Sequence, residues 1–149
     1  MARTNGRTMD RMTIPSYENL KDVPVGGDAD LTERLAATLG RALNRQVWLT
    51  FLDADDLQLP VLMPTEIPYL PGDDDGERIG GFLTQLGEDL EAETVVVAYE
   101  RPGPDTITEQ DRVWLRCLRE ACLASGMAFR GPFLCHSRGV IQVAPDDFT

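Results

Sequence analysis

The sequence predicts one α/β domain, a three-layer α/β/α sandwich with three main helices and a mixed five-stranded sheet. The segment Thr94–Gly103 has three consecutive valines and ends on Pro-Gly, which is typical of a strand buried on both faces and then stopped abruptly. A helical apolar pattern lies on each side of this strand. The chain has 149 residues, of which 42% are hydrophobic, so it can bury one core.

The first 27 residues are predicted to form a flexible or loosely docked arm, and residues 28–149 the domain itself. The arm shows no apolar period and closes on Pro24 and Gly26-Gly27, with a short turn expected near Tyr17–Leu20. It is more basic than the acidic body. Two hypotheses remain open: the arm folds back onto that body, or it binds a partner.

The segment Asp30–Glu33 has the pattern of a capping box and predicts a helix that runs to about Asn44. The apolar face of this helix is Leu31, Leu35, Leu39, Ala42 and Leu43.

A hairpin is predicted next, with strands at Val47–Leu52 and Leu57–Met63 joined by the turn Asp53–Asp56. Pro60 lies inside the returning strand and lacks a backbone N–H. The returning strand is therefore predicted to lie at an edge of the sheet.

Two further helices flank the central strand. The first follows the acidic run Asp73–Asp75, whose charges are favourable at a helix N-terminus. The second has an N-cap signal at Thr108 and Asp111 and ends before Gly126. Their apolar faces are Ile79, Phe82, Leu83, Leu86 and Leu90 in the first, and Trp114, Cys117, Leu118, Ala121 and Cys122 in the second.

A last hairpin is expected from strands at Met127–His136 and Val140–Val143. Right-handed crossovers then place the five strands in the order second, first, third, fourth, fifth, with the first antiparallel to the third. This element order is similar to the cytidine-deaminase-like fold. The zinc motifs of that family are absent, because the only histidine is His136 and Thr108–Asp111 stands where its cysteine pair belongs. Deaminase activity is therefore not expected.

The C-terminal third, together with the Asp53 hairpin, carries a second resemblance. The segments Glu100–Pro104, Asp111–Trp114, His136–Val140 and Pro145–Asp147 resemble small acidic proteins of unknown function from high-GC bacteria. This resemblance implies no activity.

Charge and cysteine content limit which partners and which cellular compartment are expected. Fourteen basic and 25 acidic residues give a net charge of −11, which repels nucleic acids and anionic membranes and suits a basic protein partner. No apolar run approaches the roughly 20 residues that a membrane span needs. The three cysteines, Cys117, Cys122 and Cys135, form an odd set without a signal peptide, so a reducing cytoplasm is expected.

Ligands of open α/β sheets bind beyond the carboxyl ends of the strands. There the predicted topology places Glu66, Glu100, Arg101 and His136 as candidate ligand-binding residues. Glu100 and His136 are also the candidate catalytic pair, because a histidine beside a carboxylate can move protons. In the alternative interpretation, Glu100 pairs with Arg101 or with an arginine of the third helix, and His136 belongs to a hairpin turn.

The densest candidate metal ligands are Asp53, Asp55 and Asp56, which suit Mg²⁺ or Mn²⁺. An aspartate-rich turn between two strands explains the same residues without a metal. No phosphate-cradling loop is present, and no cofactor is predicted.

Two hypotheses for function follow. The favoured one is a non-enzymatic protein-interaction module, adaptor-like or immunity-like, because no convergent catalytic set is found. The alternative is a small-molecule-binding domain or hydrolase-like enzyme at the carboxyl edge of the sheet. A homodimer through an edge strand, either the Pro60 strand or the last strand, is a further expectation.

Overall fold

In the computed structural model, residues 17–148 are described, and their five strands form one sheet in the order β3-β2-β4-β5-β6. β4 and β5 are parallel, whereas the other neighbours are antiparallel. The predicted strand order is therefore confirmed. The strands are β2 (Gln46–Leu52), β3 (Gln58–Glu66), β4 (Thr94–Glu100), β5 (Ala128–His136) and β6 (Gly139–Gln142).

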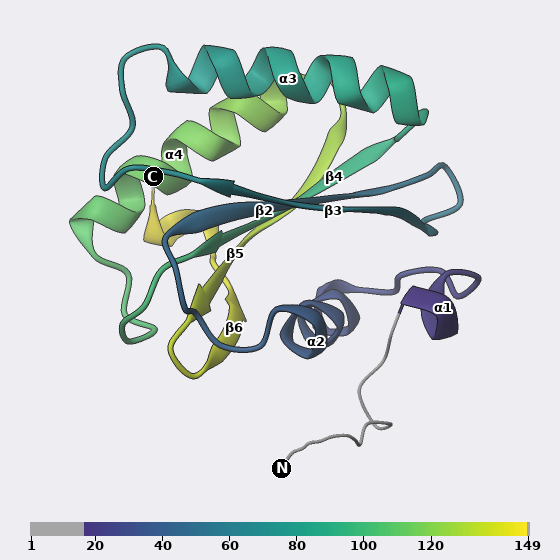
Figure 1. The fold of residues 1–149 in the computed structure, drawn as a ribbon, viewed down its shortest axis with the longest axis horizontal. Coiled ribbons are helices and arrows are strands. Elements are labelled where there is room, and N and C mark those ends of the chain that lie inside the picture. Colours follow the sequence, from purple (N-terminus) through teal and green to yellow (C-terminus); the bar gives the residue numbers. More distant parts are fainter. Residues whose placement is uncertain (1–16, 149) are drawn as a thin grey trace.

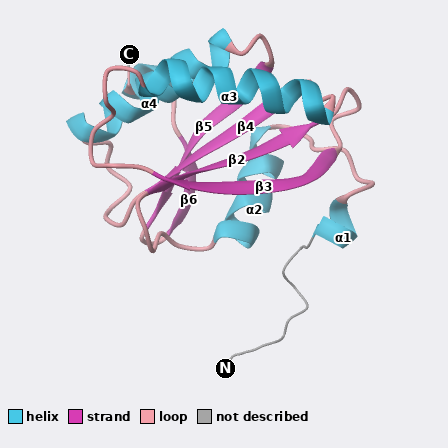
Figure 2. Cartoon of the chain, turned by 45° about the horizontal axis from the view of Figure 1, so that its top comes forward, coloured by secondary structure: helices cyan, strands magenta, loops and turns pink. Residues whose placement is uncertain are grey.

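The predicted three-layer architecture is also confirmed. Helices α3 (Asp75–Leu90) and α4 (Glu109–Ala124) lie on one face of the sheet, and α2 (Asp28–Leu39) lies on the other (Figure 1). Figure 2 shows the same layers with α3 and α4 in front of the strands and α2 behind them. The short helix α1 (Tyr17–Leu20) and the 3₁₀ turn Pro145–Asp147 complete the described elements.

Strand β4 is the centre of the core, because all seven of its residues are buried. Val95, Val97 and Tyr99 pack with the residues beneath α3 and α4, whereas Val96 and Ala98 pack with the residues beneath α2. Burial on both faces explains why this segment is apolar without alternation.

Helix α4 begins where the sequence predicts. The Thr108 hydroxyl accepts from the Asp111 N–H at 3.1 Å, and the Asp111 carboxylate accepts from the Thr108 N–H at 2.9 Å. This reciprocal capping box satisfies two N–H groups that a helix start otherwise leaves unpaired. Gly126 follows the helix with a φ of +82°, the left-handed conformation that favours glycine.

Helix α2 differs from its predicted bounds at both ends. It ends at Leu39 instead of near Asn44, because Gly40 turns the chain with a φ of +69°. It also begins at Asp28, and the Asp30 carboxylate accepts from the Gly26 N–H at 2.8 Å instead of standing at the N-cap. The five residues after Gly40 are thereby available to contact the end of β4.

Strand β3 lies at the edge of the sheet, as Pro60 predicted. Its register against β2 shifts between Thr50 and Leu52, the stretch opposite Pro60. The Ile67 N–H points to β2 and donates to the Arg45 carbonyl, so alternate positions, Pro64 among them, turn their nitrogen away from the sheet. Because proline carries no N–H, the outer edge of β3 lacks a donor at Pro64.

The predicted arm is only partly described. Residues 1–16 lie outside the described residues. Of the rest, Val25 is buried and donates its N–H to the Asp56 carbonyl at 2.8 Å, and the Val23 and Pro24 carbonyls accept from Arg34. No helix in the described part of the chain has the length and apolar character that crossing a bilayer requires.

The irregularity between β4 and β5 depends on Gly131, which has a φ of +109°. A Cβ there would lie 2.9 Å from the Val97 carbonyl oxygen, so Gly131→Ala should lower the free energy of unfolding by roughly 2–4 kcal/mol. The control is Gly81→Ala on α3, where a Cβ meets nothing within 4 Å. The higher helix propensity of alanine should there raise the free energy of unfolding by as much as about 1 kcal/mol. Urea unfolding measures the free energy of both variants, and equal changes at the two positions would contradict the role given to Gly131.

Candidate functional site

The carboxyl end of β4 carries two buried charged residues, Glu100 and Arg101. Because consecutive residues of a strand point to opposite faces, the two side chains leave β4 on different sides of the sheet. Glu100 lies on the α2 side and Arg101 on the α4 side. The structure therefore does not pair them with each other.

Glu100 is bound by four N–H donors. Its Oε2 accepts from the Leu43 N–H at 2.7 Å and the Asn44 N–H at 2.9 Å, and its Oε1 accepts from the side chains of Gln46 at 2.9 Å and Trp48 at 2.6 Å. Burial raises the pKa of Glu100, but the four hydrogen bonds outweigh burial, so the net pKa lies below its usual value. This carboxylate is held ionised, and no arginine among residues 17–148 pairs with it.

Arg101 forms a two-pronged ion pair with Asp111 at the start of α4. Nε donates to Oδ1 at 3.0 Å and Nη2 to Oδ2 at 2.7 Å, while the carbonyls of Pro104 and Thr106 also accept from the guanidinium. Burial raises the pKa of Asp111, but the hydrogen bonds from Arg101 and Thr108 outweigh it, and the net pKa is lowered. The charges of Arg101 and Asp111 are therefore paired with each other inside the fold.

The other two carboxyl-edge candidates do not converge on a pocket with these two. His136 is buried; its Nδ1 accepts from the Arg138 N–H at 3.3 Å, and its carbonyl accepts from the Ala42 N–H. Strand alternation places His136 on the face opposite Glu100. Glu66 is exposed at the end of β3, in the same cross-strand row as Gln46 and Glu100.

Cys135 and the Asp53 turn show structural roles. Burial, together with the Glu100 carboxylate, raises the pKa of the Cys135 thiol to about 11, so it is not a ready nucleophile. The Asp53 carboxylate accepts from the N–H groups of Asp55 and Leu57, at 2.8 and 3.0 Å, as turn chemistry requires. Nowhere in residues 17–148 do three or more His, Cys, Asp or Glu side chains gather as a metal site would need.

An apolar groove runs between the edge strand β3 and helix α3, and we call it the β3–α3 groove. It has a volume of about 300 Å³. The phenyl ring of Phe82, 44% exposed, stands on its α3 wall. Its lining is Val47, Leu49, Thr65, Ile67, Arg78, Ile79 and Phe82.

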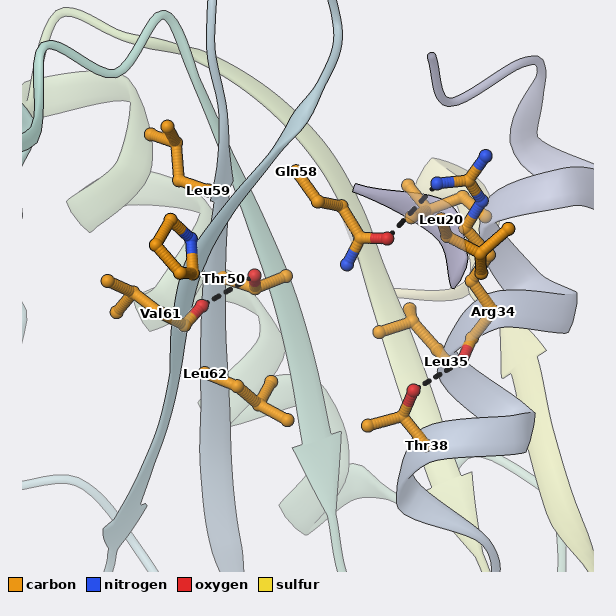
Figure 3. Close-up of a pocket in the computed structure, with 11 residues that line it drawn as sticks. Leu20, Arg34, Leu35, Thr38, Thr50, Gln58, Leu59, Val61 and Leu62 are labelled. Carbon is orange, nitrogen blue, oxygen red and sulfur yellow. Dashed lines mark hydrogen bonds between the residues drawn. The ribbon is translucent and has the colours of Figure 1, made fainter. Parts of the chain in front are cut away.

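A second hollow of about 300 Å³, the α2 pocket, lies on the opposite face of the same strands, between β3, β2 and α2. Figure 3 shows Thr50 and Leu62 on the strand side facing Leu35 and Thr38 of α2, with Arg34 and Gln58 joined by a hydrogen bond at one end. The walls are otherwise mostly leucine, valine and proline.

Sequence reasoning missed Arg34, Gln58 and the partner of Arg101. A signal existed for Arg34, which follows Leu31 by three positions and precedes Leu35, so it lies on the apolar side of α2. A signal existed for Asp111 as well, but it indicated only the helix cap. No pattern in the sequence marks Gln58.

Comparison with known proteins adds no assignment, since no protein-family model matches the sequence and no curated protein is significantly similar to it.

Replacing Asp111 should destabilise the protein strongly. Asp111→Asn keeps the size of the side chain but leaves the buried Arg101 guanidinium without its counter-charge, so the free energy of unfolding at pH 7 should fall by roughly 3–5 kcal/mol. The exposed control Asp73→Asn should change it by less than about 0.5 kcal/mol. Urea titrations of the two variants decide the point; similar losses would refute it.

The Glu100 and Asp111 carboxylates should make the protein acid-labile. Their pKa values are lowered in the folded state, so their contribution to stability is complete above about pH 4.5, the unfolded range, and is lost as pH falls further toward the folded values. Glu100→Gln should therefore flatten the decline of unfolding free energy between about pH 4.5 and pH 3. If wild type and variant decline in parallel over that interval, Glu100 does not contribute as described.

Proposed function

We propose that this chain is a non-enzymatic protein-interaction module of the cytoplasm that binds a basic segment of another protein in the β3–α3 groove. The observation that carries the proposal is an open apolar groove beside a helix with four acidic residues and one arginine.

The groove offers an anchoring site of the kind that interfaces use. Val47 and Leu49 are buried in the core and form its floor, while Ile79 and Phe82 form the α3 wall. An exposed phenyl ring next to a hollow is an energetically favourable place for a partner's apolar side chain. A single such anchor contributes about 2 kcal/mol or more.

Charge defines the partner. Helix α3 carries four acidic residues and one arginine, and that arginine, Arg78, is paired with Asp75. The chain as a whole has a net charge of −11. A basic segment is attracted to this surface, whereas a nucleic-acid backbone is repelled.

The carboxyl edge supports this proposal over the hydrolase-like alternative. Glu100 accepts four hydrogen bonds and Arg101 donates four, all within the chain. Groups so fully engaged are poorly placed to exchange protons with a substrate.

Two further features bear on the compartment and on self-association. Cys117, Cys122 and Cys135 are all free thiols, which supports a reducing cytoplasm. Pairing of two copies through β3 is disfavoured by Pro60 and Pro64, and β6 offers only four residues. A groove-bound partner is therefore favoured over an edge-strand homodimer.

Site-specific photocrosslinking tests the proposal. A benzoylphenylalanine in place of Phe82 should give an adduct, in the cells that make the protein, whose crosslinked peptide is net basic. The same group in place of Leu123, an exposed apolar residue of α4, should not. A synthetic copy of that peptide should then bind roughly tenfold or more weakly to Phe82→Ala than to wild type or Leu123→Ala. Equal adducts at the two positions, or an acidic crosslinked peptide, would rule out the groove.

A further inference from the structure

We infer that the α2 pocket is a second binding site, which takes a small organic acid with an apolar body and holds its carboxylate at the Arg34–Gln58 end. The α2 pocket lies on the opposite face of β2 and β3 from the β3–α3 groove. The inference does not depend on the function proposed for that groove.

The charge of Arg34 is only partly compensated within the protein. Its side chain is 6% exposed. Nη2 donates to the carbonyls of Val23 and Pro24, each at 3.1 Å, and both of these acceptors are neutral. Its ion-pair partner in the described part of the chain, Asp30, is 41% exposed and lies 3.3 Å from Nε.

Two N–H groups of the Arg34 guanidinium have no aligned acceptor among the described residues. Among the described side chains, Nε is the buried nitrogen that has no aligned hydrogen-bond partner. Nη1 donates to the amide oxygen of Gln58 at 3.1 Å, and its second N–H has no acceptor in the described part of the chain. A buried cation whose one ion pair is to a partly exposed carboxylate favours a further anion in the adjoining hollow.

Gln58 supplies the neutral donors. A guanidinium only donates, so the amide oxygen of Gln58 must face Arg34, and the amide nitrogen is left for the pocket. Figure 3 shows this nitrogen directed toward the space between Thr50 and Leu35. It donates to none of the residues that the structure describes. One end of the pocket thus combines N–H donors with a positive charge.

The remaining wall accommodates an apolar body. The side chains of Leu20, Leu31, Leu35 and Leu62 line it, and the hydroxyls of Thr38 and Thr50 are already engaged with the carbonyls of Arg34 and Val61, at 2.8 and 2.7 Å. A volume of about 300 Å³ is at the lower limit for ligand pockets, which selects a small molecule. A medium-chain carboxylate matches both the polar end and the apolar wall.

Calorimetric titration of the full chain at pH 7 with octanoate, octan-1-ol and octylamine separates charge recognition from simple apolar partition. Octanoate should bind saturably, octanol roughly tenfold or more weakly, and octylamine not measurably. Octanol binding as tightly as octanoate, or no saturable binding of octanoate, overturns the inference.

A near-isosteric substitution then tests the polar end. Gln58→Glu retains the pairing with Arg34 but presents a carboxylate to the pocket, so octanoate binding should be lost and octylamine binding should appear. The matched control Gln85→Glu, on the exposed surface of α3, should leave both unchanged. Octanoate binding that persists undiminished in Gln58→Glu overturns the assignment, and an unaltered unfolding midpoint verifies that the variant is folded.

Methyl NMR shifts locate the ligand independently of any variant. Octanoate should shift the resonances of Leu35 and Leu62 in the α2 pocket and leave Leu49 and Ile79 of the β3–α3 groove unmoved. Shifts confined to the groove would show that the acid binds elsewhere and would overturn the inference.

Discussion

The ion pair between Arg101 and Asp111 is the interaction on which the carboxyl end of the sheet depends. It joins Arg101, the residue that follows β4, to the first turn of α4, and the same aspartate completes the capping box with Thr108. Glu100 does the corresponding work on the other face, where it holds the segment between α2 and β2 through Leu43 and Asn44. Two adjacent charges at the end of a buried strand are thereby neutralised or solvated by the protein itself.

Because these charges are engaged within the fold, the hollows at the flank of the sheet are the surfaces considered for binding. In many α/β folds the crevice beyond the parallel strands holds the ligand. Here only β4 and β5 are parallel, and the polar groups at their ends are engaged. The edge strand β3 is instead covered incompletely by α2 on one face and by α3 on the other, and a hollow remains on each side. An edge strand interrupted by prolines offers side-chain surfaces in place of backbone pairing.

The fold was predictable from the sequence because its main signals are local. Three valines identify β4, the apolar stripe and Thr108 identify α4, and Pro60 places β3 at an edge. The contacts of Glu100 and of the α2 pocket were not predictable, because they join distant segments. Glu100 contacts Leu43 across 57 positions, and Arg34 contacts Gln58 across 24. The predicted extension of α2 to Asn44 also concealed the first contact, since helical residues would have kept those N–H groups within the helix.

The pleat of β2 and β3 keeps the two hollows chemically separate. Thr50 and Leu62 face the α2 pocket, whereas Leu49 and Thr65 face the β3–α3 groove, and these residues alternate along the same two strands. One hollow has a buried cation in its wall, and the other lies beside an acidic helix. The occupants proposed for the two hollows therefore carry opposite charges.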